Sequence, residues 1–271
     1  MSKPLIPIPT ALDRSGHLDK KIKSILFDVY GTLFISSSGD IGIAEKKAKK
    51  NYALGKLLGK FGIKKTPDTV LKDFFSIIAD KHEDLKKKGI DFPEIKVEQI
   101  WMQALDNKNL DPVRMFADEF ESLVNPVYPM PHLSKLLLAC KAGNILMGII
   151  SNAQFYTPFL FERFLGSKLE ELGFCSDLIF YSYRFGYAKP SLFLFKLAAD
   201  QLKSMGFSLN SALYLGNDML NDIYPAKKTG FQTALFAGDR RSLRLRKDDP
   251  RCKNLTPDLV ITDLIQLLDY I

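Results

Sequence analysis

The chain has 271 residues, of which 46% are hydrophobic and 25% charged, a composition typical of a globular protein with a sizeable core. No stretch approaches the roughly 18 uncharged apolar residues that a membrane span requires, and the N-terminus lacks the apolar run of a secretory signal. We therefore expect a cytoplasmic protein without membrane contact. The net charge of +7 favours a small anionic substrate, whereas no zinc or RNA-recognition motif indicates a nucleic-acid partner. The oligomeric state cannot be predicted from the sequence.

The first predicted strand lies near the N-terminus. Residues 1–20 contain several prolines and are expected to form an arm along the surface. Residues 23–30, with the sequence KSILFDVY, are almost continuously apolar. Such a run is typical of a strand covered on both faces in a parallel sheet. Gly31 and Thr32 are expected to end it.

The pattern changes between residues 42 and 125, where apolar residues recur at helical spacing from Ala44 onwards. Thr66 and Pro67 provide a helix start. The region shows no convincing strand and predicts a bundle of about four helices. We therefore expect two domains, with residues 1–40 and 126–271 forming the core and residues 41–125 an inserted helical domain. The connections at 34–40 and 125–131, rich in Ser, Gly and Pro, are the expected hinges.

Strands and helices alternate after Pro126. Strands are expected at residues 144–150, 178–183, 212–215, 233–236 and 258–261. Helices are expected at residues 132–141, 155–165, 191–205, 221–229 and 263–270. This alternation predicts an α/β fold with a doubly wound, mainly parallel sheet and right-handed crossovers.

Polar residues follow four of the predicted strands. In an open α/β sheet, ligands bind beyond the carboxyl ends of the strands. The residues at these ends are Asp28, Tyr30 and Thr32, then Ser151 and Asn152, then Lys189, and finally Asn217, Asp218 and Asp222. Each group alone has an ordinary structural explanation, such as a turn aspartate or a charged pair at a helix N-terminus. Their occurrence together at successive strand ends predicts an active site.

Four sequence segments, FDVYGTL, IISNA, GYAKPS and LGNDMLNDI, resemble in this order the four motifs of the haloacid dehalogenase-like superfamily of hydrolases. The resemblance covers about residues 21–270, and the helical insertion lies where that family carries a C1-type cap domain. It implies a Rossmann-like catalytic core and covalent catalysis by an aspartate. The family includes phosphatases, phosphonatases, dehalogenases and phosphotransferases.

The resemblance also implies roles for individual residues. Asp28 would be the nucleophile, because water can hydrolyse the ester or acyl phosphate that a carboxylate forms. Ser151 would hydrogen-bond the transferring group, and Lys189 would hold the charges of nucleophile and substrate together.

The remaining motif residues would bind substrate or metal. A Mg²⁺ ion is expected on oxygen ligands, as this ion prefers. The expected ligands are Asp28, the backbone carbonyl of Tyr30, Asp218 and Asp222. The register of the last motif is ambiguous, because Asn217 falls where many phosphatases of the family carry the first acid. The residues expected to bind substrate or to shape its loop are Tyr30, Thr32, Asn152 and Asn217.

Two motifs point to different reactions. Phosphatases of the family usually carry a second aspartate two residues after the nucleophile as general acid, and here Tyr30 takes that position. The sequence DVYGTL instead resembles the 2-haloacid dehalogenases, whose halide leaves without a proton. The motif GNDMLND, with its two aspartates, resembles the metal-binding members. In addition, residues 33–51 lack the arginine that a dehalogenase needs to receive the halide.

Weighed together, these features favour Mg²⁺-dependent hydrolysis of a small phosphate ester. The first alternative is a metal-independent hydrolase similar to the 2-haloacid dehalogenases. The second is a family member of low activity that binds a ligand or regulates, because Tyr30 has removed the acid.

Overall fold

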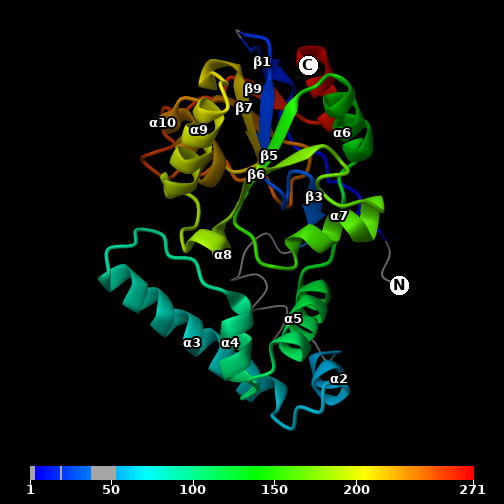
Figure 1. The fold of residues 1–271 in the computed structure, drawn as a ribbon, viewed down its shortest axis with the longest axis vertical. Helices are drawn as coiled ribbons and strands as arrows, with labels where there is room; N and C mark the ends of the chain where they lie inside the picture. The colour runs from blue at the N-terminus through cyan, green and yellow to red at the C-terminus, as the bar shows by residue number, and fades with distance from the viewer. Residues whose placement is uncertain (1–3, 19, 38–52) are drawn as a thin grey trace.

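The computed structural model describes residues 4–18, 20–37 and 53–271, which form an α/β core with a group of helices at one end (Figure 1). Within these residues the central sheet has seven strands in the order β1-β9-β8-β7-β2-β5-β6. Their bounds are Ser15–Gly16 (β1), Ser24–Phe27 (β2), Leu146–Ser151 (β5), Phe174–Tyr181 (β6), Ala212–Gly216 (β7), Gln232–Phe236 (β8) and Leu259–Ile261 (β9). Only β1 runs antiparallel to its neighbour, so the predicted mainly parallel sheet is confirmed.

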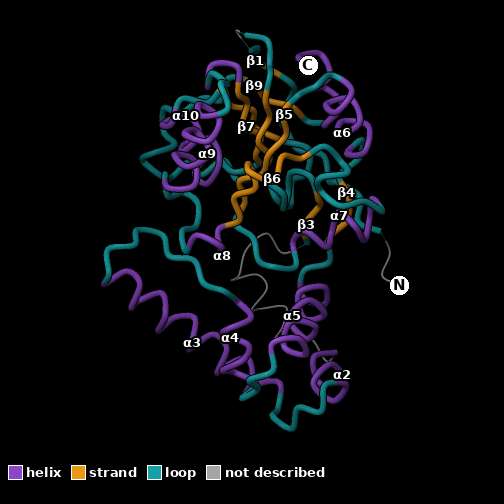
Figure 2. Tube along the Cα trace, in the orientation of Figure 1, coloured by secondary structure: helices purple, strands orange, loops and turns teal. Residues whose placement is uncertain are grey.

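Helices cover both faces of this sheet (Figure 2). They are α6 (Leu133–Ala142), α7 (Thr157–Leu165), α8 (Ser182–Phe185), α9 (Phe193–Ser204), η1 (Leu209–Ser211), η2 (Met219–Ile223), α10 (Tyr224–Thr229) and η3 (Leu264–Tyr270). In the central strand β2, Ile25 and Phe27 pack into one hydrophobic cluster and Leu26 into another. Successive strand residues point to opposite faces, so a strand buried on both sides needs an unbroken apolar run. The doubly wound architecture is thereby confirmed.

Five short elements differ from the sequence prediction. Part of the N-terminal arm forms the edge strand β1, which pairs through its backbone and has no apolar signature. The two predicted hinge segments contribute β3 (Phe34–Ser36) and β4 (Val127–Pro129), which pair as an antiparallel ribbon. Residues 38–40 of the first segment lie outside the described residues. The predicted helix at 221–229 begins as the π-helix η2, and the closing helix η3 is a 3₁₀-helix.

The helices α2 (Ala53–Lys60), α3 (Pro67–Lys87), α4 (Val97–Ala104) and α5 (Leu110–Val124) form what we call the helical unit. It has its own hydrophobic cluster centred on Trp101. The Trp101 ring stacks on Phe74 with centroids 3.9 Å apart and meets Phe120 edge-on at 4.8 Å. Thr66 caps α3, as predicted, by accepting a hydrogen bond from the Thr69 backbone. The helical pattern predicted from Ala44 falls partly outside the described residues.

The helical unit contacts the core next to the strand ends. Phe155 and Tyr156, which follow β5, pack into the cluster around Trp101. The backbone N–H of Ala188 donates to the Phe92 carbonyl (2.7 Å), which ties the segment between α3 and α4 to the loop before Lys189. None of the described helices has the length and apolar character to cross a lipid bilayer.

Candidate active site

Asp28 lies directly beyond the carboxyl end of β2. Its backbone N–H donates to the Leu215 carbonyl of β7 (2.9 Å), which continues the parallel pairing past the strand end. The chain then turns sharply at Gly31, which has a φ of +84°. A Cβ atom there would lie 2.5 Å from Ser242 Cβ, so both conformation and space require glycine. The turn leaves the Asp28 side chain at the edge of the sheet where the other strands also end.

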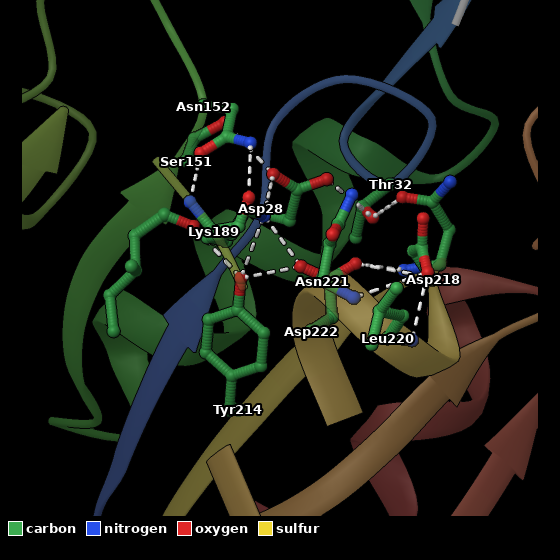
Figure 3. A network of polar contacts seen from close by, with 12 residues as sticks. Asp28, Thr32, Ser151, Asn152, Lys189, Tyr214, Asp218, Leu220, Asn221 and Asp222 are labelled. Carbon is green, nitrogen blue, oxygen red and sulfur yellow. Dashed lines mark hydrogen bonds and ion pairs between the residues drawn. The ribbon is translucent and has the colours of Figure 1, made fainter. Parts of the chain in front are cut away.

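Three side chains hold the Asp28 carboxylate (Figure 3). Ser151 Oγ donates to Oδ1 (2.8 Å), and Lys189 Nζ donates to the same oxygen (2.7 Å). From the residues that the structure describes, Oδ2 receives only a long contact from Thr32 Oγ1 (3.4 Å). The carboxylate is therefore fixed through one oxygen, while the other keeps most of its capacity to bind or attack.

Lys189 joins two carboxylates. Its ammonium donates to Asp28 Oδ1 and to Asp222 Oδ1 (2.5 Å), and also contacts the Tyr214 hydroxyl (3.2 Å). Burial disfavours the ammonium, but the two carboxylates outweigh this effect and raise the pKa of Lys189 above its usual value. Asn152 fixes the backbone of Lys189, accepting from its N–H (2.7 Å) and donating to its carbonyl (3.2 Å).

Asp222 has protein partners on both carboxylate oxygens. Besides Lys189, Oδ1 accepts from the Tyr214 hydroxyl (3.0 Å). Oδ2 accepts from the backbone N–H groups of Asn217 (3.0 Å) and Asp218 (2.9 Å). Burial raises the pKa of Asp222, and Lys189 opposes this rise. Gly216 makes room for this side chain, since a Cβ there would lie 2.3 Å from Asp222 Cγ. Asp222, predicted as a metal ligand, thus anchors Lys189 and the loop after β7.

Asp218 points to a different partner. Its Oδ1 accepts from the backbone N–H groups of Leu220 (2.8 Å) and Asn221 (3.2 Å) and so caps η2. Its Oδ2 accepts from Arg246 Nη2 (2.6 Å) and Nε (3.1 Å), which is a bidentate ion pair. The sequence prediction did not include Arg246.

Asn217 and Tyr30 complete the rim. Asn217 Oδ1 accepts from Thr32 Oγ1 (3.1 Å), and Asn217 Nδ2 donates to the Ser242 carbonyl (2.6 Å). The Tyr30 hydroxyl lies 3.0 Å from Thr157 Oγ1. Burial raises the pKa of Tyr30 far above its usual value, so this phenol stays protonated at every physiological pH.

These side chains border a cavity of about 520 Å³ between the strand ends and the helical unit. Among the predicted residues, those that line it are Asp28, Tyr30, Asn152, Lys189, Asn217, Asp218 and Asp222. Ser151 and Thr32 lie beneath its surface and reach it through Asp28. On the opposite side the helical unit and the segment between its helices contribute His82, Glu94 and Glu121. The structure therefore brings all nine predicted residues to one place.

Comparisons with known proteins agree with the fold. No protein-family model matches the chain. A protein of Methanocaldococcus jannaschii named glyceraldehyde 3-phosphate phosphatase is 29% identical over 255 residues, covering 92% of this chain and 97% of its own. The 2-haloacid dehalogenase of Pseudomonas syringae superposes with a TM-score of 0.55 at 20% identity, covering 92% and 97% of the two chains. The chain therefore has the fold of the haloacid dehalogenase-like hydrolases.

A phosphatase of the superfamily from Thermococcus onnurineus also has the fold, with a TM-score of 0.52, 16% identity, and coverage of 92% and 97%. Solved structures with the fold of this chain thus carry the names of both phosphatases and dehalogenases. The fold alone does not choose between the two reactions, so the choice depends on the residues of the cavity.

Besides His82, Glu94 and Glu121 on the helical side, the sequence prediction missed Tyr214 and Arg246. Tyr214 lies within β7, where alternation predicts an apolar core residue, and its ring is indeed buried while its hydroxyl reaches Lys189 and Asp222. Arg246 belongs to the basic run 240–247, which resembles an ordinary solvated surface. In that run Arg241 instead binds Asp239 and the Ile6 carbonyl of the N-terminal arm.

The oxygen atoms on the cavity wall suit a magnesium ion in kind. The carboxylates of Asp28 and Asp218 and the Tyr30 carbonyl are hard donors, and no hydrogen bond to that carbonyl is found in the described residues. Across residues 4–18, 20–37 and 53–271 there is no group of three or more acidic, His or Cys side chains arranged around a metal position. Magnesium needs only one or two carboxylates when water and a substrate phosphate supply the remaining ligands.

Proposed function

We propose that this haloacid dehalogenase-like hydrolase cleaves small phosphate monoesters through a covalent intermediate on Asp28. The observation that carries the proposal is the position of the Asp28 carboxylate on the cavity wall. Ser151 and Lys189 hold one of its oxygens, so the other oxygen is available as a nucleophile. The archaeal relative named as a phosphatase supports the choice of phosphate esters.

The proposed reaction has two displacements. An oxygen of Asp28 attacks the phosphorus atom, forming a new O–P bond as the bond to the leaving oxygen breaks. Water then attacks the same phosphorus, which releases inorganic phosphate and restores the carboxylate. Lys189 offsets negative charge on the transferring group, and Asp222 holds Lys189 in place through the 2.5 Å ion pair.

We propose that Mg²⁺ is held by Asp28, the Tyr30 carbonyl and Asp218. When bound there, the ion would offset the charge of the phosphoryl oxygens. Asp222 is not in this set, because the buried Lys189, Tyr214 and two backbone N–H groups hold its oxygens, whereas the contacts to Asp218 Oδ2 come from Arg246, whose side chain is 38% exposed.

The leaving group receives no proton from Tyr30 in this proposal. Its phenol, with a raised pKa and a hydroxyl bonded to Thr157, is a poor acid. We therefore expect faster hydrolysis of aryl phosphates, whose leaving oxygen needs no proton, than of unactivated alkyl phosphates.

We propose the helical unit as the cap domain that selects the substrate. It supplies one side of the cavity through His82, Glu94 and Glu121, and it packs around its own hydrophobic cluster. Its ties to the loop beside Lys189 through Ala188 and Phe92 would couple the cap to the catalytic lysine. A cap of this kind excludes water during the reaction.

A second candidate function is metal-independent dehalogenation of 2-haloacids. Tyr30 favours it, because a halide leaves without a general acid. In that reaction Asp28 would attack carbon rather than phosphorus, and water would then hydrolyse the resulting ester.

The test is hydrolysis of an aryl phosphate and of L-2-chloropropionate, each with Mg²⁺ and with EDTA, using Asp28→Asn. An exposed variant, Asp13→Asn, serves as the matched control. Phosphate release that requires both Mg²⁺ and Asp28 is the expected result. Chloride release that survives EDTA would instead establish the dehalogenase reaction. Phosphate release that is unchanged in Asp28→Asn would refute the proposal.

A further inference from the structure

The guanidinium of Arg246 forms an ion pair with the carboxylate of Asp218 on the cavity wall. Three contacts join them, from Nη2 to Oδ2 (2.6 Å) and from Nε to Oδ2 (3.1 Å) and Oδ1 (3.2 Å). The Asp218 side chain is 8% exposed, whereas that of Arg246 is 38% exposed. The carboxylate is thus held in place, while the arginine retains access to the cavity.

The backbone around Arg246 is fastened to the loop after β7. The N–H of Arg244 donates to the Asn217 carbonyl (3.0 Å), and the N–H of Met219 donates to the Arg244 carbonyl (2.8 Å). Two residues later Arg246 has a φ of +49°, a left-handed conformation that long side chains rarely adopt. The fold therefore directs this particular side chain back to Asp218.

Asp218 is the carboxylate of this loop that can change partners. Asp222 is committed to four protein donors on its two oxygens. Asp218 uses Oδ1 to cap η2, but the close contacts of Oδ2 are to Arg246. A divalent ion that binds Oδ2 must displace a bidentate guanidinium, because both would need the same lone pairs.

We propose that Arg246 competes with the divalent ion for Asp218 and that the displaced guanidinium binds the phosphate oxygens of the substrate. This inference rests on the proposed function and assigns it a further substrate-binding residue. A planar guanidinium pairs with phosphate through two parallel hydrogen bonds, as it does with a carboxylate. Arg246 lines the cavity that contains Asp28, so its guanidinium can move from Asp218 to a substrate phosphate within the same cavity.

The exchange predicts two effects of opposite sign. Removing Arg246 frees Asp218, so a divalent ion binds more tightly. The same change removes an anion-binding group, so phosphate binds more weakly. A residue that only stabilised the loop would not strengthen metal binding when removed.

The experiment uses the full-length chain freed of metal, with Mn²⁺ as the probe and electron paramagnetic resonance as the readout. Arg246→Ala is expected to bind Mn²⁺ about tenfold more tightly than the wild type and to raise the inhibition constant of inorganic phosphate about tenfold, as expected for loss of a close charge pair. Arg244→Ala is the matched control. It removes the same charge from the same cavity wall, but its guanidinium donates to the Arg241 and Leu243 carbonyls rather than to Asp218.

Equal changes in both arginine variants would overturn the inference, because the effect would then come from the loss of one positive charge near the cavity rather than from the ion pair with Asp218. Unchanged Mn²⁺ affinity in Arg246→Ala, or no Mn²⁺ binding by either protein, would also overturn it. If Arg246→Ala does not fold, Arg246→Lys keeps the charge without the fork and should strengthen Mn²⁺ binding by a smaller factor. Failure of the proposed function is separate, since it is the loss of Asp28-dependent phosphate release.

Discussion

The two sides of the cavity hold their carboxylates in different ways. At the strand ends, Asp28, Asp218 and Asp222 each have a cationic partner. On the opposite side, Glu94 and Glu121 have no ion pair within the described part of the chain. Their hydrogen bonds are to neutral groups such as Gln154 and Ser182 for Glu94, and Asn125 and Tyr156 for Glu121.

This difference has electrostatic consequences. Opposite charges favour the ionised form of a carboxylate, whereas burial among neutral groups disfavours it. Burial raises the pKa of Glu94 and of Glu121, and it also raises that of Asp222, where the Lys189 ammonium opposes the rise. The strand-end side is thus organised around ion pairs. The helical side instead presents buried carboxylates that are hydrogen-bonded to neutral groups.

Lys189→Met should produce the largest effect, because Lys189 binds two buried carboxylates at once. We expect kcat for an aryl phosphate to fall about 10²–10³-fold through lost charge stabilisation. Stability should fall by about 3–5 kcal/mol, because two buried charges lose their partner. Steady-state kinetics and urea denaturation measure these effects, with the exposed Lys196→Met as control. A fall in kcat of less than threefold would remove Lys189 from the proposed mechanism.

Trp101→Ala should destabilise the helical unit without changing any residue of the catalytic network. Trp101 is 1% exposed and packs against Phe74, Phe116 and Phe120. Its loss should destabilise the protein by about 3–5 kcal/mol in urea denaturation. The exposed Met115→Ala on α5 should have little effect. If Trp101→Ala left stability unchanged, packing of the aromatic cluster would not be what stabilises the helical unit.

Tyr30→Asp should restore a general acid beside the nucleophile. We expect kcat/KM for alkyl phosphates to rise about 10²-fold, which is the usual size of general acid catalysis. Aryl phosphates should change little, because their leaving oxygen needs no proton. The ratio of the two substrates in parallel assays is the measurement, and Tyr30→Phe is the control. An equal rise with both substrates would show that Tyr30 acts by shape rather than by lacking acidity.

Glu121→Gln should have the smallest effect and should depend on pH. The raised pKa of Glu121 means that the folded protein binds a proton more tightly than the unfolded chain does. Wild-type stability therefore falls as pH rises from the ordinary carboxyl pKa to the raised one. Glutamine mimics the protonated form, so the variant should gain stability over the wild type at pH 8 but not at pH 4. Urea denaturation at both values, with the exposed Glu162→Gln as control, tests this sign.

The sequence predicted those features that depend on local pattern. The apolar run before Asp28 predicted the central strand, and polar residues after each strand predicted one cluster, because parallel strands end at one edge of the sheet. The partner of each carboxylate could not be predicted in this way. Whether Asp218 or Asp222 faces Lys189 depends on the π-helical turn of η2, which the spacing of GNDMLND does not specify.

Arg246 and β1 escaped prediction for a related reason. Arg246 reaches Asp218 because the segment at Arg244 pairs with the loop after β7, a contact between residues 26 positions apart in the chain. The edge strand Ser15–Gly16 pairs with β9 through backbone groups alone. Neither contact leaves a periodic trace in the amino-acid pattern.

The central claim, a covalent intermediate on Asp28, is tested most directly by acid quenching during a single turnover. The wild-type protein would be mixed with an aryl phosphate carrying labelled phosphorus, stopped within milliseconds and cleaved into peptides for mass spectrometry. The predicted result is one labelled phosphoryl group on the peptide that contains Asp28, with none in Asp28→Asn. Phosphate release without any labelled peptide, or a label on another residue, would contradict the account.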